Sequence, residues 1–240
     1  MPDTVSSLKR KLALAYQILY QEGLAREDTL GHASVRLPGE SLCYVKPWGV
    51  GFEEVTPECL LSMDLEGNKV GGGEGRLHSE MPLHSEIYRA RPDVNCVIHI
   101  HPFHATLLSS VWRGGLRIVN QNTQIFAAGV AMYASSELIR SVETGRAVAE
   151  ALGAGNALLM KNHGIVVAGQ SLEQTLVLAV QLEKAALTHL TLAPFREVSE
   201  IPTPVATRWA EELMRPVHCT NKFEYWCRKL QREGVGAYRG

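Results

Sequence analysis

Histidines gather in one part of this 240-residue chain, and two of them have the spacing of metal ligands. His99-Ile100-His101 lies at the end of an apolar stretch. Side chains alternate between the two faces of a β-strand, so a strand over residues 95–101 directs His99 and His101 to the same side. Neutral imidazoles are common ligands of divalent metal ions. The pair therefore predicts a metal site on one face of a sheet.

His163 is the predicted third ligand. It follows the apolar segment 157–160, which favours a strand, and Gly164 permits a tight backbone turn beside the metal. Three histidines that leave one coordination position open are typical of catalytic metal sites, whereas structural sites are closed. The alternative interpretation is that residues 162–164 form an ordinary polar turn.

Glu80 is predicted to join this site as a metal ligand and as the acid–base group. A carboxylate beside a divalent ion can bind the ion or exchange a proton with the substrate. Alternatively, Glu80 is an ordinary charge in the first turn of a helix expected over about residues 79–89. His84 follows on the same helix. It is a candidate proton donor, or a helix residue that faces the metal layer.

The composition is that of an ordinary globular protein, with 45% hydrophobic residues, 20% charged residues and a formal net charge of −1. This balance gives no support for nucleic acid or an anionic membrane as a partner. No apolar run approaches the roughly 20 residues needed to cross a membrane. The five cysteines contain no CxxC pair and leave an odd one over, which favours a reducing, cytoplasmic location.

Helix and strand patterns interleave along the chain and must position these residues. Helical periodicity is found over residues 7–22, 79–89, 138–152, 172–191, 209–214 and 222–232. Strand patterns are found over residues 34–37, 42–45, 61–65, 69–70, 95–101, 157–160 and 165–167. Thr56 and Pro57 have the residue types that begin a helix, so a brief helix is expected there. Because there is no strict βαβ period, we expect a mixed sheet covered by helices.

These motifs together resemble the class II aldolase/adducin family over about residues 7 to 192. The resemblance is carried by Gly31-x-x-Ser34-Val35-Arg36, Lys46-Pro47-Trp48-Gly49, Ser79-Glu80, Arg91-Pro92-Asp93, His99-x-His101 and His163-Gly164. It implies an α/β protein with a three-layer α/β/α fold around a mixed, largely antiparallel central sheet. It also implies one divalent metal ion per subunit (zinc, manganese or iron) on His99, His101 and His163, with Glu80 as the catalytic carboxylate. A homotetramer with sites at subunit interfaces is implied as well.

The segments that bind phosphate in the sugar-phosphate members differ here. His32 stands where asparagine is usual, Trp48 where threonine is usual, and His78 where serine is usual, while Gly49 and Ser79 remain. Trp48 fills space that a phosphate needs and offers an aromatic face on which a ring can stack. Alternatively, it packs under its own loop. We therefore expect these five residues to bind a small-molecule carboxylate substrate.

The resemblance is strongest to family members that decarboxylate hydroxylated aromatic or pyridine carboxylates, notably over residues 76–84 and 158–164. We therefore expect a metal-dependent carbon–carbon lyase, and specifically a decarboxylase of a hydroxylated aromatic or heteroaromatic carboxylate. The alternatives are a sugar-phosphate aldolase or 4-epimerase, a non-catalytic adducin-like binding module, and an iron-dependent oxygenase on the same fold. Arg76 is expected to hold the carboxylate through its planar guanidinium, or else to be an ordinary loop arginine.

We expect residues 1–200 to form the catalytic domain and residues 201–240 to form a C-terminal helical extension. The aromatic and basic cluster around Tyr225 suits a lid over the site or an interface between subunits, or else a peripheral helix. Tyr225 is therefore included among the expected substrate-binding residues. Tyr133 and Tyr238 are further candidate sources of a tyrosine for catalysis.

Overall fold

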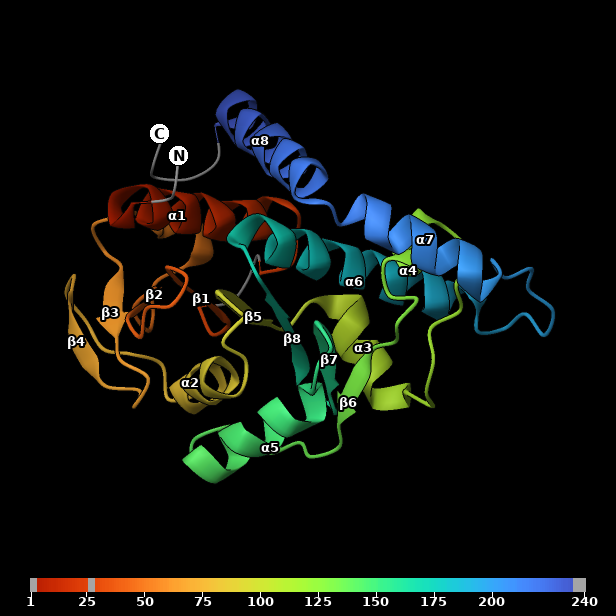
Figure 1. Ribbon diagram of the computed structural model, residues 1–240, viewed down its shortest axis with the longest axis horizontal. Coiled ribbons are helices and arrows are strands. Elements are labelled where there is room, and N and C mark those ends of the chain that lie inside the picture. Colours follow the sequence, from red (N-terminus) through yellow and green to blue (C-terminus); the bar gives the residue numbers. More distant parts are fainter. Residues whose placement is uncertain (1–3, 26–28, 235–240) are drawn as a thin grey trace.

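A mixed sheet of eight strands lies at the centre of the computed structural model, which describes residues 4–25 and 29–234. The strand order is β4-β3-β2-β1-β5-β8-β7-β6 (Figure 1). Neighbouring strands run antiparallel except β6 and β7, which are parallel. The strands are β1 (His32–Arg36), β2 (Cys43–Val45), β3 (Leu61–Met63), β4 (Lys69–Gly72), β5 (Cys96–Ile100), β6 (Ala131–Tyr133), β7 (Ala157–Met160) and β8 (Gly164–Gly169). The predicted α/β fold with a largely antiparallel sheet is confirmed.

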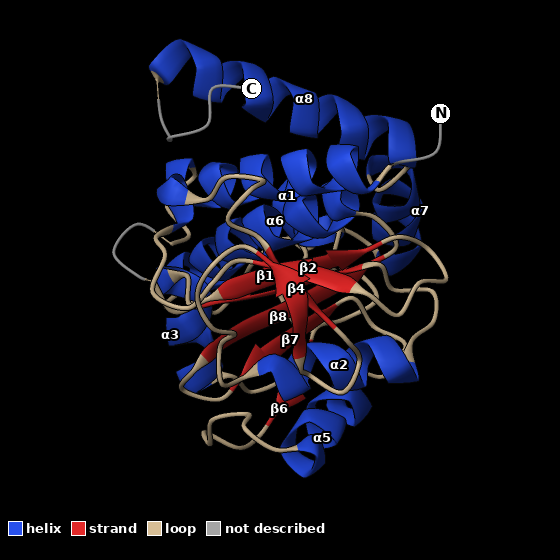
Figure 2. Ribbon diagram, turned by 90° about the vertical axis from the view of Figure 1, so that its left-hand side faces the viewer, coloured by secondary structure: helices blue, strands red, loops and turns tan. Residues whose placement is uncertain are grey.

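Helices cover both faces of the sheet and give three layers, as Figure 2 shows. One face carries α1 (Val5–Gln21), α3 (Phe103–Val111), α4 (Gln121–Gln124), α6 (Leu172–Leu192), α7 (Thr203–Leu213) and α8 (Pro216–Glu233). The other face carries α2 (Met81–Ala90) and α5 (Val142–Leu152). No described helix combines the length and the apolar character needed to cross a membrane.

The alternation of side chains along β5 divides the core in two. Ile98 and Ile100 are fully buried in the cluster that contains the apolar residues of α1 and α6. Val97 is fully buried in the cluster that contains those of α2 and α5. His99 therefore faces the α2 layer, as the period of two along a strand predicts.

Several elements differ from the sequence prediction: α3, α4 and β6 were not predicted, and α7 and α8 begin earlier than residues 209 and 222. The helix expected over residues 138–152 begins only at Val142, because the Ser141 hydroxyl accepts from the backbone N–H of Thr144 and ends the preceding loop. The brief helix expected at Thr56 is wrong. Residues 57–59 form a turn, and a 3₁₀ turn, η1 (Phe52–Glu54), lies just before it.

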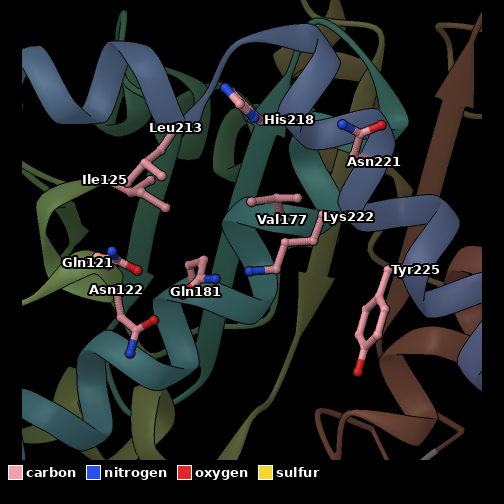
Figure 3. Close-up of a pocket in the computed structure, with 10 residues that line it drawn as sticks. All are labelled: Gln121, Asn122, Ile125, Val177, Gln181, Leu213, His218, Asn221, Lys222 and Tyr225. Carbon is pink, nitrogen blue, oxygen red and sulfur yellow. The ribbon is translucent and has the colours of Figure 1, made fainter.

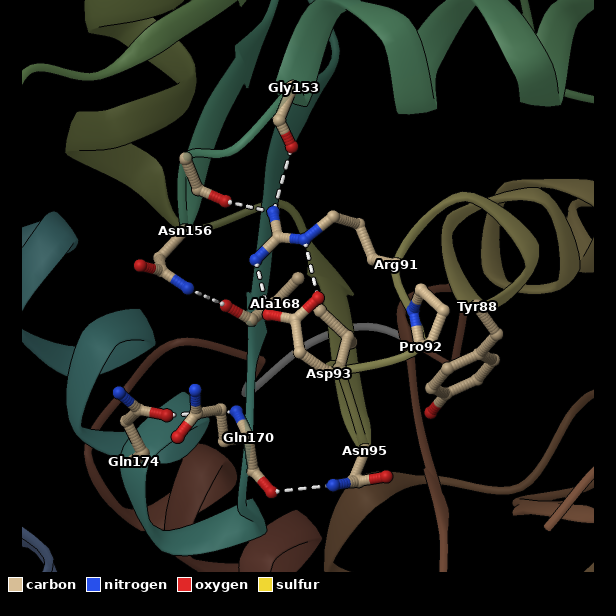
Figure 4. A network of polar contacts seen from close by, with 12 residues as sticks. Tyr88, Arg91, Pro92, Asp93, Asn95, Gly153, Asn156, Ala168, Gln170 and Gln174 are labelled. Carbon is tan, nitrogen blue, oxygen red and sulfur yellow. Dashed lines mark hydrogen bonds and ion pairs between the residues drawn. The ribbon is translucent and has the colours of Figure 1, made fainter. Parts of the chain in front are cut away.

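Arg91 and Asp93 form a network that fixes the turn between α2 and β5 (Figure 4). The Arg91 guanidinium donates two hydrogen bonds to the Asp93 carboxylate, at 2.8 and 2.7 Å. It also donates to the backbone carbonyls of Gly153 and Gly155, which precede β7. This motif thus has a structural part: it ties the start of the strand that carries His99 to the loop that leads into β7.

The C-terminal extension packs on the same core as the rest of the chain. Phe223, Trp226 and Leu230 of α8 are buried in the cluster that α1 and α6 line, and Trp226 is only 2% exposed. The Lys229 ammonium lies 2.9 Å from a carboxylate oxygen of Glu22, just past α1. Helix α8 is therefore anchored on α1 and α6. Tyr238 lies outside the described residues.

Candidate metal centre

His99 projects from β5 with one ring nitrogen already engaged. Its Nδ1 atom lies 2.9 Å from the backbone carbonyl of Ile165, on the neighbouring strand β8. A carbonyl oxygen can only accept, so Nδ1 must carry the proton and Nε2 must hold the free electron pair. Metal-binding histidines usually have such a partner on the far nitrogen, because it fixes both the tautomer and the ring orientation. His99 is fully buried and thus presents Nε2 as a preset ligand atom.

His101 and His163 bring two more imidazoles to the same point. His101 follows the end of β5, and its Nε2 lies 3.2 Å from Nε2 of His99. His163 lies in the turn between β7 and β8, where Asn162 has a φ of 54°. The turn approaches β5 closely: a Cβ atom on Gly164 would lie 2.5 Å from the carbonyl oxygen of Ile100. The bare glycine therefore lets His163 reach the other two rings.

The three side chains fit a divalent metal ion. One ring nitrogen of each lies within 4.8 Å of the others. Zinc–nitrogen bonds of about 2.0–2.1 Å in tetrahedral geometry place ligand nitrogens roughly 3.4 Å apart, close to the 3.2 Å between His99 and His101. Among the described residues, Nδ1 of His163 is buried without a hydrogen-bond partner. Burial lowers the pKa of His163, which favours the neutral ring that binds a cation and not a proton.

Glu80 stands beside these nitrogens at the start of α2. Its Oε2 atom lies 3.7 Å from Nε2 of His99 and 3.9 Å from Nε2 of His163. Its Oε1 atom accepts from the backbone N–H of Ile139 at 2.9 Å. Burial opposes ionisation of the carboxyl, but His99 and the Ile139 N–H outweigh it and lower the pKa to about 2. Glu80 is thus a carboxylate at neutral pH, able to accept a proton.

A second set of histidines lies behind the first. His32 stands directly opposite His99 across β1 and β5, with the ring centroids 5.1 Å apart. His84 is fully buried on α2, and its Nε2 lies 2.7 Å from Nδ1 of His32. Burial, followed by repulsion from His99 and His78, lowers the pKa of His84 to about 3. His84 is not among the residues that line the cavity, and it contacts His32, which is; its role as a proton donor stays a prediction.

His78 is held by a buried ammonium group. Nε2 of His78 lies 3.3 Å from Nζ of Lys46, which also donates to the backbone carbonyls of Thr29 and Val50. Burial and repulsion from Lys46 lower the pKa of His78 to about 3, while a hydrogen bond to the backbone of Pro47 opposes them. His78 is therefore a neutral ring with its polar atoms directed into the protein.

A cavity of about 420 Å³ opens in front of both sets of histidines. Its lining residues are Leu30, His32, Trp48, His78, Ser79, Glu80, His101, Leu138, Arg140, Asn162 and His163. Trp48 is 48% exposed, and the Arg76 guanidinium lies over its ring at 4.0 Å from the centroid. Arg76 therefore supports Trp48 from outside the lining, and Gly49 lies in the turn beyond it with a φ of 82°.

Tyr225 lies in a different cavity, of about 500 Å³, between α4, α6 and the extension (Figure 3). Its neighbours there include Gln181, Lys222 and His218. Within one chain, the structure does not bring Tyr225 to the histidine cavity. Its predicted contact with substrate stays a prediction.

Arg140 is one of the cavity residues that the sequence analysis missed, together with Leu30, Leu138 and Asn162. It lies in the loop before α5, where Ile139 contacts Glu80 through its backbone. The prediction placed this segment inside a helix, so its side chains were not considered. The signal that was available is Ser141, a preferred helix-capping residue three positions before Thr144. A boundary at Ser141 leaves Leu138 and Arg140 in a loop, where binding residues are frequent.

Comparisons with known proteins show the family and the fold of the chain. The family model described as "Class II Aldolase and Adducin N-terminal domain" matches residues 10–190. The chain is 30% identical to a 3,4-dihydroxyphthalate decarboxylase of Arthrobacter keyseri over 89% of this chain and 96% of that protein. A solved aldolase II superfamily protein of Pseudomonas syringae has a TM-score of 0.87 at 22% identity, covering 98% and 96%. A solved L-fuculose 1-phosphate aldolase of Glaciozyma antarctica has a TM-score of 0.84 at 26% identity, with the same coverage.

Proposed function

The chain belongs to the class II aldolase and adducin family, and we propose that it is a divalent-metal-dependent decarboxylase of a hydroxylated aromatic or heteroaromatic carboxylate. One observation carries the proposal. Three imidazoles and an ionised carboxylate converge on a cavity whose other walls include an indole and an arginine, Trp48 and Arg140. The similarity to a decarboxylase of a dihydroxylated aromatic dicarboxylate over nearly the whole chain supports it.

His99, His101 and His163 would hold the ion. A zinc, manganese or iron(II) ion there supplies a Lewis acid that stabilises negative charge on an oxygen of the substrate. The histidines must be neutral to bind it, and the Ile165 carbonyl keeps Nε2 of His99 free of a proton. Stabilising the transition state by about 1.4 kcal/mol raises the rate tenfold.

The other cavity residues position the substrate. Trp48 offers a half-exposed aromatic face against which a substrate ring can stack, and Arg76 behind it holds the indole in place. Arg140 offers a planar guanidinium to a carboxylate of the substrate. Arg140 thus takes the role that the sequence analysis gave to Arg76.

Glu80 moves the proton. As an ionised carboxylate it accepts the proton of a ring hydroxyl, which makes the ring electron-rich. The bond between the ring carbon and the carboxylate breaks, carbon dioxide leaves, and the bonding electrons stay on the ring carbon. Glu80 returns its proton to that carbon, and a solvent proton restores the hydroxyl. The backbone N–H of Ile139 keeps Oε1 engaged, which leaves Oε2 for this transfer.

A sugar-phosphate aldolase or 4-epimerase is the second candidate, and the similarity to an L-fuculose 1-phosphate aldolase is the observation that favours it. Against it, Trp48 fills the loop where a phosphate would lie, and neither His32 nor His78 carries a positive charge to meet a dianion, because burial lowers the pKa of both. A non-catalytic adducin-like module is disfavoured because the metal-binding side chains are present and assembled. An iron-dependent oxygenase shares the ligand set and differs in its need for oxygen.

We propose further that the protein works in the cytoplasm as a homotetramer with sites at subunit interfaces. Exposed apolar side chains along α3 support an interface between subunits: Phe103, Leu107 and Val111 lie at helical spacing and are 68%, 45% and 57% exposed. Five free thiols suit a reducing compartment. Light scattering on a sizing column tests the tetramer directly.

A substrate panel tests the proposed chemistry. The protein, loaded in turn with zinc, manganese and anaerobic iron(II), is incubated with hydroxyaromatic dicarboxylates and with pentulose or fuculose phosphates. We expect carbon dioxide from the first group without oxygen consumption. Trp48→Phe should retain most of this activity and Trp48→Ala should raise KM, since only the first keeps an aromatic face. Aldehyde released from a sugar phosphate alone would reject the decarboxylase.

A further inference from the structure

Four buried polar groups form a continuous row from the core to the cavity wall. The Tyr88 hydroxyl lies 2.8 Å from Oγ of Ser34, and Ser34 Oγ lies 2.6 Å from Nδ1 of His84. His84 Nε2 lies 2.7 Å from Nδ1 of His32, which lines the cavity. All four side chains are at most 2% exposed. The order is therefore Tyr88, Ser34, His84 and His32, with no solvent to exchange partners along the way.

Tyr88 sets the direction of the row because it stands at the inner end. Among the described residues, Ser34 is the hydrogen-bond partner of its hydroxyl group. Burial raises the pKa of Tyr88 well above its usual value, so the group keeps its proton. A buried O–H that lacks an acceptor costs about 1–3 kcal/mol. Tyr88 must therefore donate to Ser34.

The direction of the first hydrogen bond fixes the direction of each hydrogen bond that follows. With Tyr88 donating to Ser34, the serine proton has one remaining acceptor, Nδ1 of His84. A His84 ring that accepts at Nδ1 carries its proton on Nε2 and donates it to Nδ1 of His32. A His32 ring that accepts at Nδ1 carries its own proton on Nε2. This arrangement satisfies every group in the row, whereas the reverse direction leaves the Tyr88 proton without an acceptor.

We propose that Tyr88, Ser34 and His84 are positioning residues that hold His32 as an Nε2–H donor toward the substrate. The role of His32 toward substrate rests on the proposed function, whereas the position of its proton does not. Nδ1 of His32 is occupied by His84, so Nε2 is the atom left for a ligand in the cavity. An N–H at this place suits a carboxylate or carbonyl oxygen and repels a cation.

The same row decides between two overlapping groups of metal-binding side chains. His99, His101 and His163 form one group, while His32, Glu80 and His99 form another. A metal ligand needs a free electron pair, and a His32 ring protonated at Nε2 has none to offer. The row therefore excludes His32 from the metal ion and assigns it to the substrate. Without the row, His32 could carry its proton on Nδ1 and present the electron pair of Nε2 to the cavity.

Nuclear magnetic resonance reads the position of the proton without any substrate. Zinc-loaded protein labelled with nitrogen-15 histidine distinguishes protonated from unprotonated ring nitrogens, and His32→Gln assigns the His32 signals. We expect Nε2 of His32 to be protonated and Nδ1 to be an acceptor. Ser34→Ala should abolish the preference of His32 for the Nε2–H tautomer, whereas Ser34→Thr, which keeps the hydroxyl, should retain it. A proton on Nδ1 of His32 in the native protein would overturn the inference.

Kinetics and metal content then show whether Ser34 acts by orienting His32 or only by packing in the core. In the accepted substrate, Ser34→Ala should raise KM about 10-fold to 100-fold, the value of one hydrogen bond to a charged group, while zinc content stays at the native level. Ser34→Thr should restore KM. If His32 in Ser34→Ala loses its preference for the Nε2–H tautomer while KM stays unchanged, the role of His32 toward substrate is refuted. The assignment of the proton in the native protein then still holds.

A second variant keeps the test decisive where Ser34→Ala fails to fold. Tyr88→Phe removes only the inner donor, so the serine proton and the His84 proton are no longer forced into one direction. We expect a mixture of the two His32 tautomers by resonance, with folding checked by circular dichroism. A single unchanged Nε2–H tautomer in folded Tyr88→Phe would contradict the direction argued from Tyr88.

Discussion

Two sets of three histidines surround one cavity and differ in what their ring nitrogens bind. In the ligand set, His99, His101 and His163, ring nitrogens converge within 4.8 Å of one another. In the buried set, His32, His78 and His84, ring nitrogens meet protein partners at 2.6 to 3.3 Å. His32 and His99 are direct cross-strand neighbours, yet they belong to different sets.

The difference shows that the partner of one ring nitrogen decides the use of the other. The Ile165 carbonyl accepts a hydrogen bond from Nδ1–H of His99, which leaves the electron pair of Nε2 for a cation. His84 does the opposite for His32: it donates a hydrogen bond to Nδ1 of His32, so the proton of His32 lies on Nε2 and faces the cavity. One residue type thereby provides both the ligands of a metal ion and the wall of a substrate site.

Removing one member of each set gives the largest expected contrast. His101→Gln should lose most of the bound metal and at least about a thousandfold in turnover, since the ion contributes several kcal/mol to the transition state. His78→Gln should keep its metal, because its Nε2 bonds to Lys46 and not to the ion. Metal analysis and turnover measure both. Equal metal loss in the two variants would mean that the buried set also binds the ion, and the distinction between the two sets would be wrong.

Glu80 lies between the sets and tests whether the ligand set is complete without it. Glu80→Gln keeps the size and removes the charge, and we expect bound metal to remain while turnover falls by about 10² to 10⁴, the range for loss of an acid–base group. Glu80→Asp is the control, since it keeps a carboxylate on a shorter arm and should lose less. Loss of the metal in Glu80→Gln would make Glu80 a required ligand.

The sequence predicted the parts of this comparison that depend on local spacing. Two histidines at a period of two on an apolar strand, and a third before a glycine, needed no tertiary information. The family resemblance extended this to the fold.

The placements that local patterns did not reveal depend on how distant segments approach. Arg140 enters the cavity because the loop before α5 closes over Glu80, and no periodicity marks that contact. His84 has the same residue type as a ligand, but its place on α2 behind His32 is decided by packing. Tyr225 is aromatic and accessible, yet α8 carries it to another cavity.

Gly164 offers a way to disturb the ligand set alone. Its Cβ in Gly164→Ala would lie 2.5 Å from the Ile100 carbonyl oxygen and 2.7 Å from the His101 ring, so the turn must shift away from β5. We expect metal affinity to fall about 10-fold to 100-fold, as when ligand orientation is lost. Competition with a coloured zinc chelator measures it. Gly71→Ala, which meets only the Ser62 hydroxyl at 3.0 Å, is the control. An unchanged affinity would show that the turn has room.

The buried set makes its own prediction, in the stability of the metal-free protein at acid pH. The pKa of His84 is about 3 in the folded protein, chiefly because burial penalises its charged form, and about 6.5 in the unfolded chain. Between these values the unfolded state binds a proton that the folded state excludes, so the contribution of His84 is complete above pH 6.5 and is lost as the pH falls toward 3.

His84→Gln should therefore flatten the dependence of unfolding free energy on pH. The native protein loses about 1.4 kcal/mol per pH unit through His84 in this window, and the variant does not. Denaturant unfolding at pH 5 to 8 measures both proteins, and above pH 6.5 their curves should run parallel, which is the internal control. Parallel curves down to pH 5 as well would mean that His84 takes up a proton in the folded state. A charged His84 donates from both nitrogens, and the Ser34 and Tyr88 protons would then have to turn away from it.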